Sequence, residues 1–171
     1  DLIKLANKHP RVNILKPGTG VGGHCISVDP WFLISENIEN TKLIRTAREV
    51  NNLKTKWVIN KIKKISDKHF KKTGSKPKIT CLGLAFKPDI DDLRESRAVE
   101  VVETLLDEGY EISAVEPNIN SHINLPLLNF SNAIEQSDIV CILVAHREFL
   151  DSQVKDQLKK CGALDFCGVL S

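Results

Sequence analysis

Hydrophobic positions change their spacing along the chain, and the change predicts two structural regions. Between residues 41 and 70, apolar side chains recur at the three- and four-residue spacing of an amphipathic helix. These positions are Leu43, Ile44, Ala47, Val50, Trp57, Val58, Ile62 and Ile65. Because a helix of about thirty residues exceeds the usual globular range, we expect it to cross a domain or to pack against a partner subunit.

After residue 78, short apolar runs alternate with helical patterns. The expected strands are 79–85, 110–115, 138–145 and 163–166, and the expected helices are 96–108, 130–136 and 148–160. This alternation favours an α/β fold with a Rossmann-like, doubly wound parallel sheet. The polar segment 71–78, which contains glycine and proline, is typical of a linker. We therefore expect one region at 1–75, with the long helix, and a second domain at 76–171.

The start of the chain is already amphipathic, with no helix cap and no methionine. We expect residues 1–8 to be the rear of a helix, and the chain to be the C-terminal piece of a longer protein. A short helix is expected over 30–36, with Asp29 as its N-cap and Pro30 at its first position.

A glycine-rich stretch precedes that short helix. Its four glycines tolerate positive φ and let backbone N–H groups approach a ligand closely. They are Gly18, Gly20, Gly22 and Gly23. Cys25 follows directly, just ahead of a helix N-terminus, a setting that favours a thiolate. We interpret the stretch as an active-site loop with Cys25 as nucleophile. The alternative is a simple turn beside a small buried cysteine, with Asp29 acting only as a cap.

Basic and amide side chains near this loop have two interpretations. Arg11 and Lys16 flank the glycines, an arrangement that suits phosphate oxygens, although taken alone they read as solvated loop cations. The polar groups on the long helix are interpreted as a solvated face. They are Arg45, Arg48, Asn51 and Asn52.

A second candidate loop, 86–94, follows the first strand of the α/β region. Ligands of parallel sheets bind beyond the carboxyl ends of the strands. The dinucleotide fingerprint G-x-G-x-x-G is absent after Gly83, so no conventional NAD site is expected in this domain. A nucleotide bound mainly through Lys87 fits better, and the alternative is an exposed turn with internal ion pairs.

Composition excludes several classes of function. With 24 basic and 22 acidic residues, the net charge of +2 gives no reason to expect nucleic acid or an anionic membrane as a partner. The longest apolar runs are too short to span a bilayer. Five cysteines without a C-x-x-C pair argue against a zinc site and a disulfide framework, so we expect no metal and a cytoplasmic location.

Three motifs carry a family resemblance. Gly-Val-Gly-Gly-His-Cys-Ile-Ser-Val-Asp-Pro at 20–30 resembles the catalytic-cysteine loop of the UDP-glucose/GDP-mannose dehydrogenase family. Residues 83–96 resemble its UDP-binding motif, and residues 44–52 resemble the start of its dimerisation helix. The His24-Cys25 pair and the Asp-Pro-Trp ending resemble the branch that acts on UDP-N-acetyl-D-mannosamine.

The resemblance implies an oxidoreductase that converts the C6 hydroxyl of a nucleotide sugar to a carboxylate in two NAD-dependent steps, for surface polysaccharide synthesis. It implies that Cys25 forms a thiohemiacetal and then a thioester, and that Asp29 orients or deprotonates water. The implied substrate contacts are His9, Arg11, Lys16, Gly22, Phe86 and Lys87, and the implied NAD contact is Arg94. His9 and Arg11 would reach a neighbouring subunit's site. The implied partners are a UDP-sugar, a second copy bound through helix 41–70, and an N-terminal NAD domain.

The sequence departs from the family pattern at several points, and these departures leave alternative functions open. The family's N-terminal Rossmann domain and upstream catalytic lysine and asparagine are not in these 171 residues, so we expect no turnover by this chain alone. Cys167 stands where relatives carry an arginine that contacts the nucleotide. A lost charge-assisted contact is worth about 1.5–3 kcal/mol, unless a cation such as Lys160 compensates. Arg97, which replaces a proline, is expected to alter only the helix start. A sibling substrate (UDP-N-acetylglucosamine or UDP-glucose) and a non-catalytic UDP-binding and dimerisation module stay open.

Overall fold

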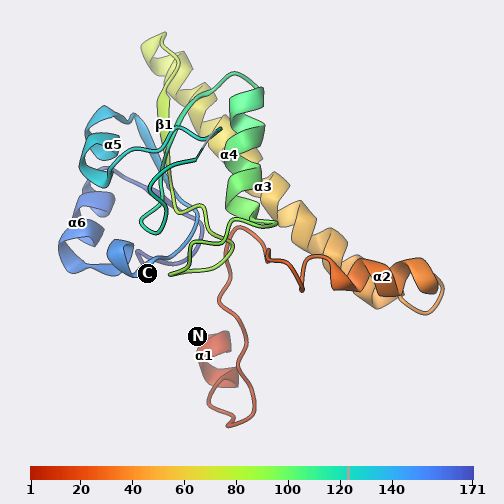
Figure 1. Cartoon of the computed structure of the whole chain (residues 1–171). Coiled ribbons are helices and arrows are strands. Elements are labelled where there is room, and N and C mark those ends of the chain that lie inside the picture. The colour runs from red at the N-terminus through yellow and green to blue at the C-terminus, as the bar shows by residue number, and fades with distance from the viewer. Residues whose placement is uncertain (123) are drawn as a thin grey trace.

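The computed structural model describes residues 1–122 and 124–171 and contains a four-stranded parallel sheet (Figure 1). Its strands are β1 (Lys78–Leu82), β2 (Glu111–Val115), β3 (Ile139–Ile142) and β4 (Leu164–Asp165), in the order β2-β1-β3-β4. The predicted α/β class with a parallel sheet is confirmed.

Helices cover both faces of the sheet (Figure 1). The elements are α1 (Leu2–Ala6), α2 (Asp29–Glu36), α3 (Lys42–Thr73), α4 (Arg97–Asp107), α5 (Phe130–Gln136), η1 (Arg147–Leu150) and α6 (Ser152–Lys160). Apolar residues of α3 and α4 pack on one face of the sheet, and those of α5, η1 and α6 pack on the other. The sheet is therefore doubly wound, as the alternating pattern predicts.

The long helix α3 serves two regions of the molecule. Its C-terminal half buries Val58, Ile59 and Ile62 in the core that β1 and α4 share. Leu43 and Trp57, which belong to the same predicted apolar pattern, are 83% and 51% exposed. Gly74, in the left-handed conformation, ends the helix, and β1 begins shortly after it. The division of the chain at residues 75/76 stays a prediction.

Several details differ from the predicted elements. The strands predicted at 79–85 and 138–145 end at Leu82 and Ile142, and α3 continues to Thr73, into the predicted linker. The predicted helix 148–160 is broken into η1 and α6, because the Asp151 side chain caps α6 by accepting the N–H groups of Gln153 and Val154. The strand predicted at 163–166 is only two residues long. Asp29 is the first residue of α2 and makes no side-chain cap bond, so the prediction that it is the N-cap was wrong.

The loops that follow β1 and β3 meet at the point where the strand order reverses. Gly83 ends β1 with φ +87°, and a Cβ added to it would lie 2.5 Å from the Cβ of Val144. The carboxyl ends of parallel strands at such a reversal are where ligands of these sheets bind. The loop 86–94, predicted to carry nucleotide contacts, follows closely after Gly83.

The N-terminal segment projects away from the sheet-bearing body (Figure 1). It is closed on itself by Asn7, whose side chain accepts the N–H of Ile14 and donates to its carbonyl oxygen. In the described part of the chain, no helix combines the length and the apolar character needed to cross a membrane.

Candidate active site

Cys25 and Asp29 lie on one helical turn. The Cys25 carbonyl oxygen accepts the N–H groups of Val28 at 3.0 Å and Asp29 at 2.9 Å. Side chains four residues apart on such a turn lie on the same side of it. Both side chains are exposed, so the thiol and the carboxylate face solvent together. This is the arrangement expected of a nucleophile with a neighbouring water-orienting group.

The glycine-rich stretch is fastened across helix α3. The Asn51 side chain accepts the Val21 N–H at 2.7 Å and donates to the Val21 carbonyl at 3.0 Å. One turn later, Thr55 donates its hydroxyl to the Thr19 carbonyl at 3.2 Å. The position of the Cys25 loop is therefore set by polar side chains of α3.

Glycines allow the loop to pack against Phe86. A Cβ on Gly22 would overlap the carbonyl oxygen of Glu95, and a Cβ on Gly23 (φ +93°) would lie 2.8 Å from Cε2 of Phe86. The ring of His24 meets Phe86 edge-on, at 6.2 Å between centroids. The structure thus brings together two predicted substrate contacts, because a Cβ on Gly22 would lie 3.3 Å from the Cβ of Phe86.

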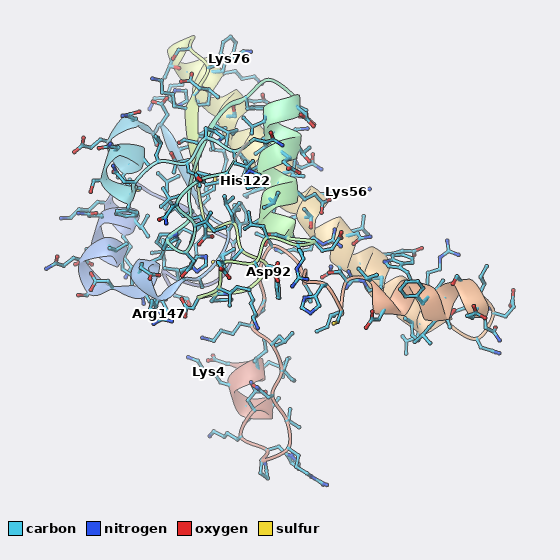
Figure 2. All side chains as sticks on the ribbon, viewed as in Figure 1. Lys4, Lys56, Lys76, Asp92, His122 and Arg147 are labelled. Atoms are coloured by element: carbon cyan, nitrogen blue, oxygen red, sulfur yellow. The ribbon has the colours of Figure 1, made fainter. Side chains whose placement is uncertain are left out.

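The loop after β1 carries cations beside this contact. Lys87 is exposed, with its Nζ 5.6 Å from the centroid of the Phe86 ring. Arg94 is exposed and donates Nη2–H to Asp92 at 2.6 Å. Figure 2 shows Asp92 near the lower end of α4, beside the chain that leads to α1 and α2.

Charges at this edge of the site are coupled. Hydrogen bonds from Arg94 lower the pKa of Asp92 to about 2. The same bonds, and the charge of Asp92, raise the pKa of Arg94, with a smaller contribution from the charge of Cys25. Asp92, which binds Arg94, also lies 4.0 Å from Nδ1 of His24, the residue before Cys25. Arg94, the predicted cofactor contact, is therefore held at the edge of the cysteine loop.

Three predicted substrate contacts lie apart from this cluster. His9, Arg11 and Lys16 are exposed on the segment around and after α1. Among the described residues, no hydrogen bond or ion pair joins residues 1–16 to the rest of the chain. Figure 2 shows Lys4 of the same segment far from Asp92. The roles of these three residues stay predictions that require a neighbouring molecule.

Helix α3 contains buried polar residues that the sequence interpretation assigned to a solvated face. Arg48 is only 6% exposed, and its Nε and Nη2 have no hydrogen-bond partner among the described residues. Burial and the nearby charge of Arg97 lower the Arg48 pKa. The solvated-face interpretation was therefore wrong for Arg48, and for Asn51, which binds Val21. The spacing of these residues could have indicated their full or partial burial. Arg48 and Asn51 continue the buried stripe of Thr55 and Val58 at three- and four-residue intervals.

Arg97 does more than begin α4. Its Nη1 donates to Glu100 at 2.7 Å, and its Cγ would lie 3.1 Å from a Cβ on Gly20. The expectation that it alters only the helix start was therefore wrong, because its side chain also packs under the glycine-rich stretch.

Cys167 cannot take over the role of an arginine. Its Sγ lies 3.7 Å from the Ile142 carbonyl oxygen, and burial and the charge of Asp165 raise its pKa to about 12. The Asp165 carboxylate instead accepts backbone N–H groups of Cys167, Gly168 and Leu170. The end of the chain thus offers a neutral thiol at this position.

A group of three possible metal ligands lies nearby. One ligand atom from each of Asp89, His146 and Glu148 falls within 4.8 Å of the others. Both ring nitrogens of His146 are already engaged, however, Nδ1 with the Asp89 N–H and Nε2 with Glu116. We therefore do not interpret the group as a metal site.

Comparisons with known proteins identify similar sequences and structures. The model of the UDP-glucose/GDP-mannose dehydrogenase family, UDP binding domain, matches residues 80–171, and that of the family's central domain matches residues 1–53. The chain is 50% identical over 169 residues to a UDP-N-acetyl-D-mannosamine dehydrogenase of Campylobacter jejuni, covering 94% of this chain and 40% of that protein. It is 45% identical over 178 residues to an NDP-N-acetyl-D-galactosaminuronic acid dehydrogenase of Ralstonia nicotianae, covering 100% of this chain and 40% of that protein.

A solved structure of a related enzyme has a similar fold. The UDP-D-ManNAc dehydrogenase of Pyrococcus horikoshii superposes with a TM-score of 0.77 at 30% identity, over 99% of this chain and 40% of that one. The chain spans about 40% of the length of the curated relatives named above. The motifs, the fold and the two domain matches agree, and the chain belongs to the UDP-glucose/GDP-mannose dehydrogenase family.

Proposed function

We propose that this chain is the C-terminal part of an NAD-dependent UDP-N-acetyl-D-mannosamine 6-dehydrogenase. It supplies the nucleophile, the dimer helix and the UDP-binding domain. The observation that carries the proposal is the packing of Gly22 and Gly23 on the Lys87-bearing loop at Phe86. This contact brings the loop that carries the exposed Cys25 thiol against the loop that carries the exposed Lys87. Such a pairing of loops suits a nucleotide sugar whose diphosphate is held by a cation and whose reactive carbon lies near sulfur.

Each exposed group has a chemical role in this proposal. Lys87 binds the diphosphate of UDP through its ammonium group. The Cys25 thiol adds to the C6 aldehyde that the first oxidation forms, its proton passes to the aldehyde oxygen, and the adduct is a thiohemiacetal. Loss of a hydride from that carbon and of the proton from its hydroxyl group leaves a thioester. Water, oriented by Asp29, attacks the thioester carbonyl, releases the carboxylate product and returns the thiol.

The residues present fit a contact to NAD but not its whole binding site. Arg94 is an exposed guanidinium held by Asp92, whose carboxylate also lies 4.0 Å from His24 of the cysteine loop. The N–H groups of Leu84 and Ala85, where a dinucleotide fingerprint would hold phosphate, are already bonded to Glu116. NAD, when bound, accepts the hydride of each oxidation. In this proposal the rest of its site comes from an N-terminal domain, so the chain alone is inactive.

The proposed sugar is N-acetyl-D-mannosamine, oxidised for surface polysaccharide. It is supported by the His24-Cys25 pair and by the name of the Campylobacter jejuni relative. The Ralstonia nicotianae relative carries the name of a different N-acetylated sugar, which keeps sibling substrates open.

Association through α3 completes the proposal. Leu43, Val50, Leu53 and Trp57 are each more than half exposed and recur at helical spacing along α3. A second copy would cover this stripe, and His9 and Arg11 on the projecting segment would then reach the neighbour's site. The five cysteines are free thiols, which supports a cytoplasmic location.

The test is the stoichiometry of the complete gene product. We expect two NADH per UDP-N-acetyl-D-mannosamine, and loss or stalling of this yield in Cys25→Ser. Cys161→Ser is the matched control, since Cys161 is also exposed but lies at the end of α6. Formation of no NADH from this sugar, UDP-N-acetylglucosamine or UDP-glucose, by a protein that still binds UDP, would leave the non-catalytic module as the function.

A further inference from the structure

Glu116 and His146 form a buried pair at the point where the strand order reverses. Glu116 directly follows β2, and His146 follows β3. Their side chains are both 0% exposed, and His146 Nε2 lies 3.0 Å from Glu116 Oε2. The chemistry proposed at Cys25 uses neither residue, so the pair needs an explanation of its own.

The pair binds the backbone of the loop that follows β1. Glu116 Oε2 accepts the N–H groups of Leu84 at 2.7 Å and Ala85 at 3.0 Å. His146 Nδ1 accepts the N–H of Asp89 at 2.9 Å. Because a backbone N–H only donates, Nδ1 is unprotonated and the ring proton lies on Nε2, facing Glu116. The two side chains thus hold both ends of the stretch 84–89.

The far end of that stretch is in a conformation that needs support. Asp89 has φ +63°, in the left-handed region that residues with a Cβ rarely adopt. Besides its N–H bond to His146, its Oδ1 accepts the Arg147 N–H at 2.8 Å. The turn at Asp89 therefore depends on the segment after β3, and Phe86 and Lys87 lie between the two anchored ends.

Glu116 stays ionised in this position. Burial alone would raise its pKa, but hydrogen bonds from His146, Leu84 and Asn118 outweigh burial and lower the pKa to about 2. Its Oε1 accepts the Asn118 N–H at 3.0 Å, so both carboxylate oxygens are satisfied. The carboxylate occupies the backbone N–H groups where a dinucleotide-binding sheet receives phosphate. A nucleotide must therefore bind through the loop itself.

We propose that Glu116 and His146 are positioning residues for nucleotide binding, which fix the stretch 84–89 so that Phe86 and Lys87 face the UDP diphosphate. The inference rests on the proposed function, because it takes UDP as the ligand of this loop. It predicts that the pair acts through the loop backbone and touches neither substrate nor cofactor.

Two substitutions of His146 separate the two anchors. Glutamine places its amide near the position of Nε2, so His146→Gln keeps a donor to Glu116 and removes the acceptor for Asp89. Asparagine places its amide near Nδ1, so His146→Asn keeps that acceptor and removes the bond to Glu116. Ile62→Val, in the core on the opposite face of the sheet, is the control for lost stability alone.

The measurements are backbone amide exchange and UDP affinity in the complete gene product. In His146→Gln we expect about tenfold faster exchange at Asp89, with Thr80 and Cys81 in β1 unchanged. We also expect about tenfold weaker UDP binding and a KM for the UDP-sugar raised by a similar factor, with kcat within about twofold. His146→Asn should keep Asp89 protected and bind UDP more tightly than His146→Gln does. Ile62→Val should leave exchange at Asp89 and UDP affinity unchanged.

The outcomes distinguish this inference from the proposed function. A wild-type protein that binds UDP, with a His146→Gln variant that binds it equally tightly or keeps Asp89 protected, overturns the inference alone. A wild-type protein with protected Leu84 and Asp89 amides that binds no UDP overturns the proposed function, and with it the assignment of this loop to a nucleotide.

Discussion

Asn51 holds Val21 with both polar atoms of its side-chain amide, at 2.7 and 3.0 Å. This side chain on α3 therefore pairs with the loop backbone as a residue of a neighbouring β-strand would. It satisfies one N–H and one carbonyl group of a loop that forms no regular secondary structure. Cys25 follows a few residues later, so the side chain of Asn51 bears on the position of the thiol.

Replacing Asn51 should loosen the cysteine loop. In Asn51→Leu, the Val21 N–H and carbonyl lose their partners, and we expect a loss of about 1–3 kcal/mol in the free energy of unfolding. Denaturant unfolding of this chain measures it. Asn60→Leu, exposed on the same helix, is the control and should change little. Equal stability of the two variants would show that the Asn51 bonds are dispensable.

Gly22 and Gly18 should respond oppositely to alanine. A Cβ at Gly22 meets the carbonyl of Glu95, whereas nothing lies within 4 Å of a Cβ at Gly18. We expect Gly22→Ala to destabilise the chain by about 1–3 kcal/mol and to abolish the dehydrogenase activity proposed for the complete protein. Gly18→Ala should be close to neutral in both assays. Full activity in Gly22→Ala would contradict the close contact of the two loops.

The buried carboxylate of Glu116 predicts a pH dependence of stability. Its pKa falls from 4.5 to about 2 on folding, so its contribution is fully present above about pH 4.5 and is lost as the pH falls toward 2. The shift corresponds to about 3 kcal/mol.

Glu116→Gln tests this dependence. The free energy of unfolding of wild type and variant is compared at about pH 6 and about pH 3, within the window where the contribution falls. The advantage of wild type should be largest at the higher pH and smaller at the lower one. A constant difference across this range would mean that Glu116 does not titrate with folding.

Arg48 is predicted to act against stability. Its guanidinium is buried, and two of its nitrogens have no partner in the part of the chain that the structure describes. Such a state costs free energy unless acceptors are supplied. We expect Arg48→Met to raise the free energy of unfolding of this chain by about 1–3 kcal/mol. Arg45→Met, which removes an exposed ion pair with Glu49, should change it by less than about 0.5 kcal/mol. A destabilised Arg48→Met would show that the guanidinium has acceptors.

Cys167 predicts weak nucleotide binding that an arginine would restore. Its thiol carries no positive charge, whereas the family resemblance implies an arginine at this position. We expect Cys167→Arg to tighten UDP binding by about tenfold or more, in line with a charge-assisted hydrogen bond. Cys161→Arg, at the exposed end of α6, should leave the affinity unchanged. Calorimetric titration with UDP measures the affinities of the two variants and the wild type. Equal affinities of Cys167→Arg and the wild type would exclude position 167 from the nucleotide site.

The order of strands and helices could be predicted because local spacing determines it. Buried strands such as β1 are short apolar runs, and α4 begins where Ser96 caps it, as a pattern of polar and apolar residues indicates. The break before α6 was missed, because Asp151 acts as a cap within a stretch that is helical by spacing alone.

The candidate site was predictable only in part. The turn joining Cys25 to Asp29 is local, so sequence places both residues on it. The burial of Arg48 and the bonds of Asn51 depend on a loop crossing α3 from elsewhere in the chain, which periodicity along one helix does not reveal. The same is true of Glu116 and His146, which meet only because β2 and β3 lie on opposite sides of β1.

Helix α3 also has a mechanical consequence. Its 32 residues contain neither glycine nor proline and extend about 48 Å as a stiff rod. The C-terminal half of the helix packs into the core of the sheet domain. Asn51, in its N-terminal half, hydrogen-bonds Val21 of the glycine-rich stretch that leads to Cys25. We therefore expect the loop that carries Cys25 and the loop that carries Lys87 to move together. In the proposed enzyme, a change in the angle between its domains would then leave the distance between these two loops unchanged.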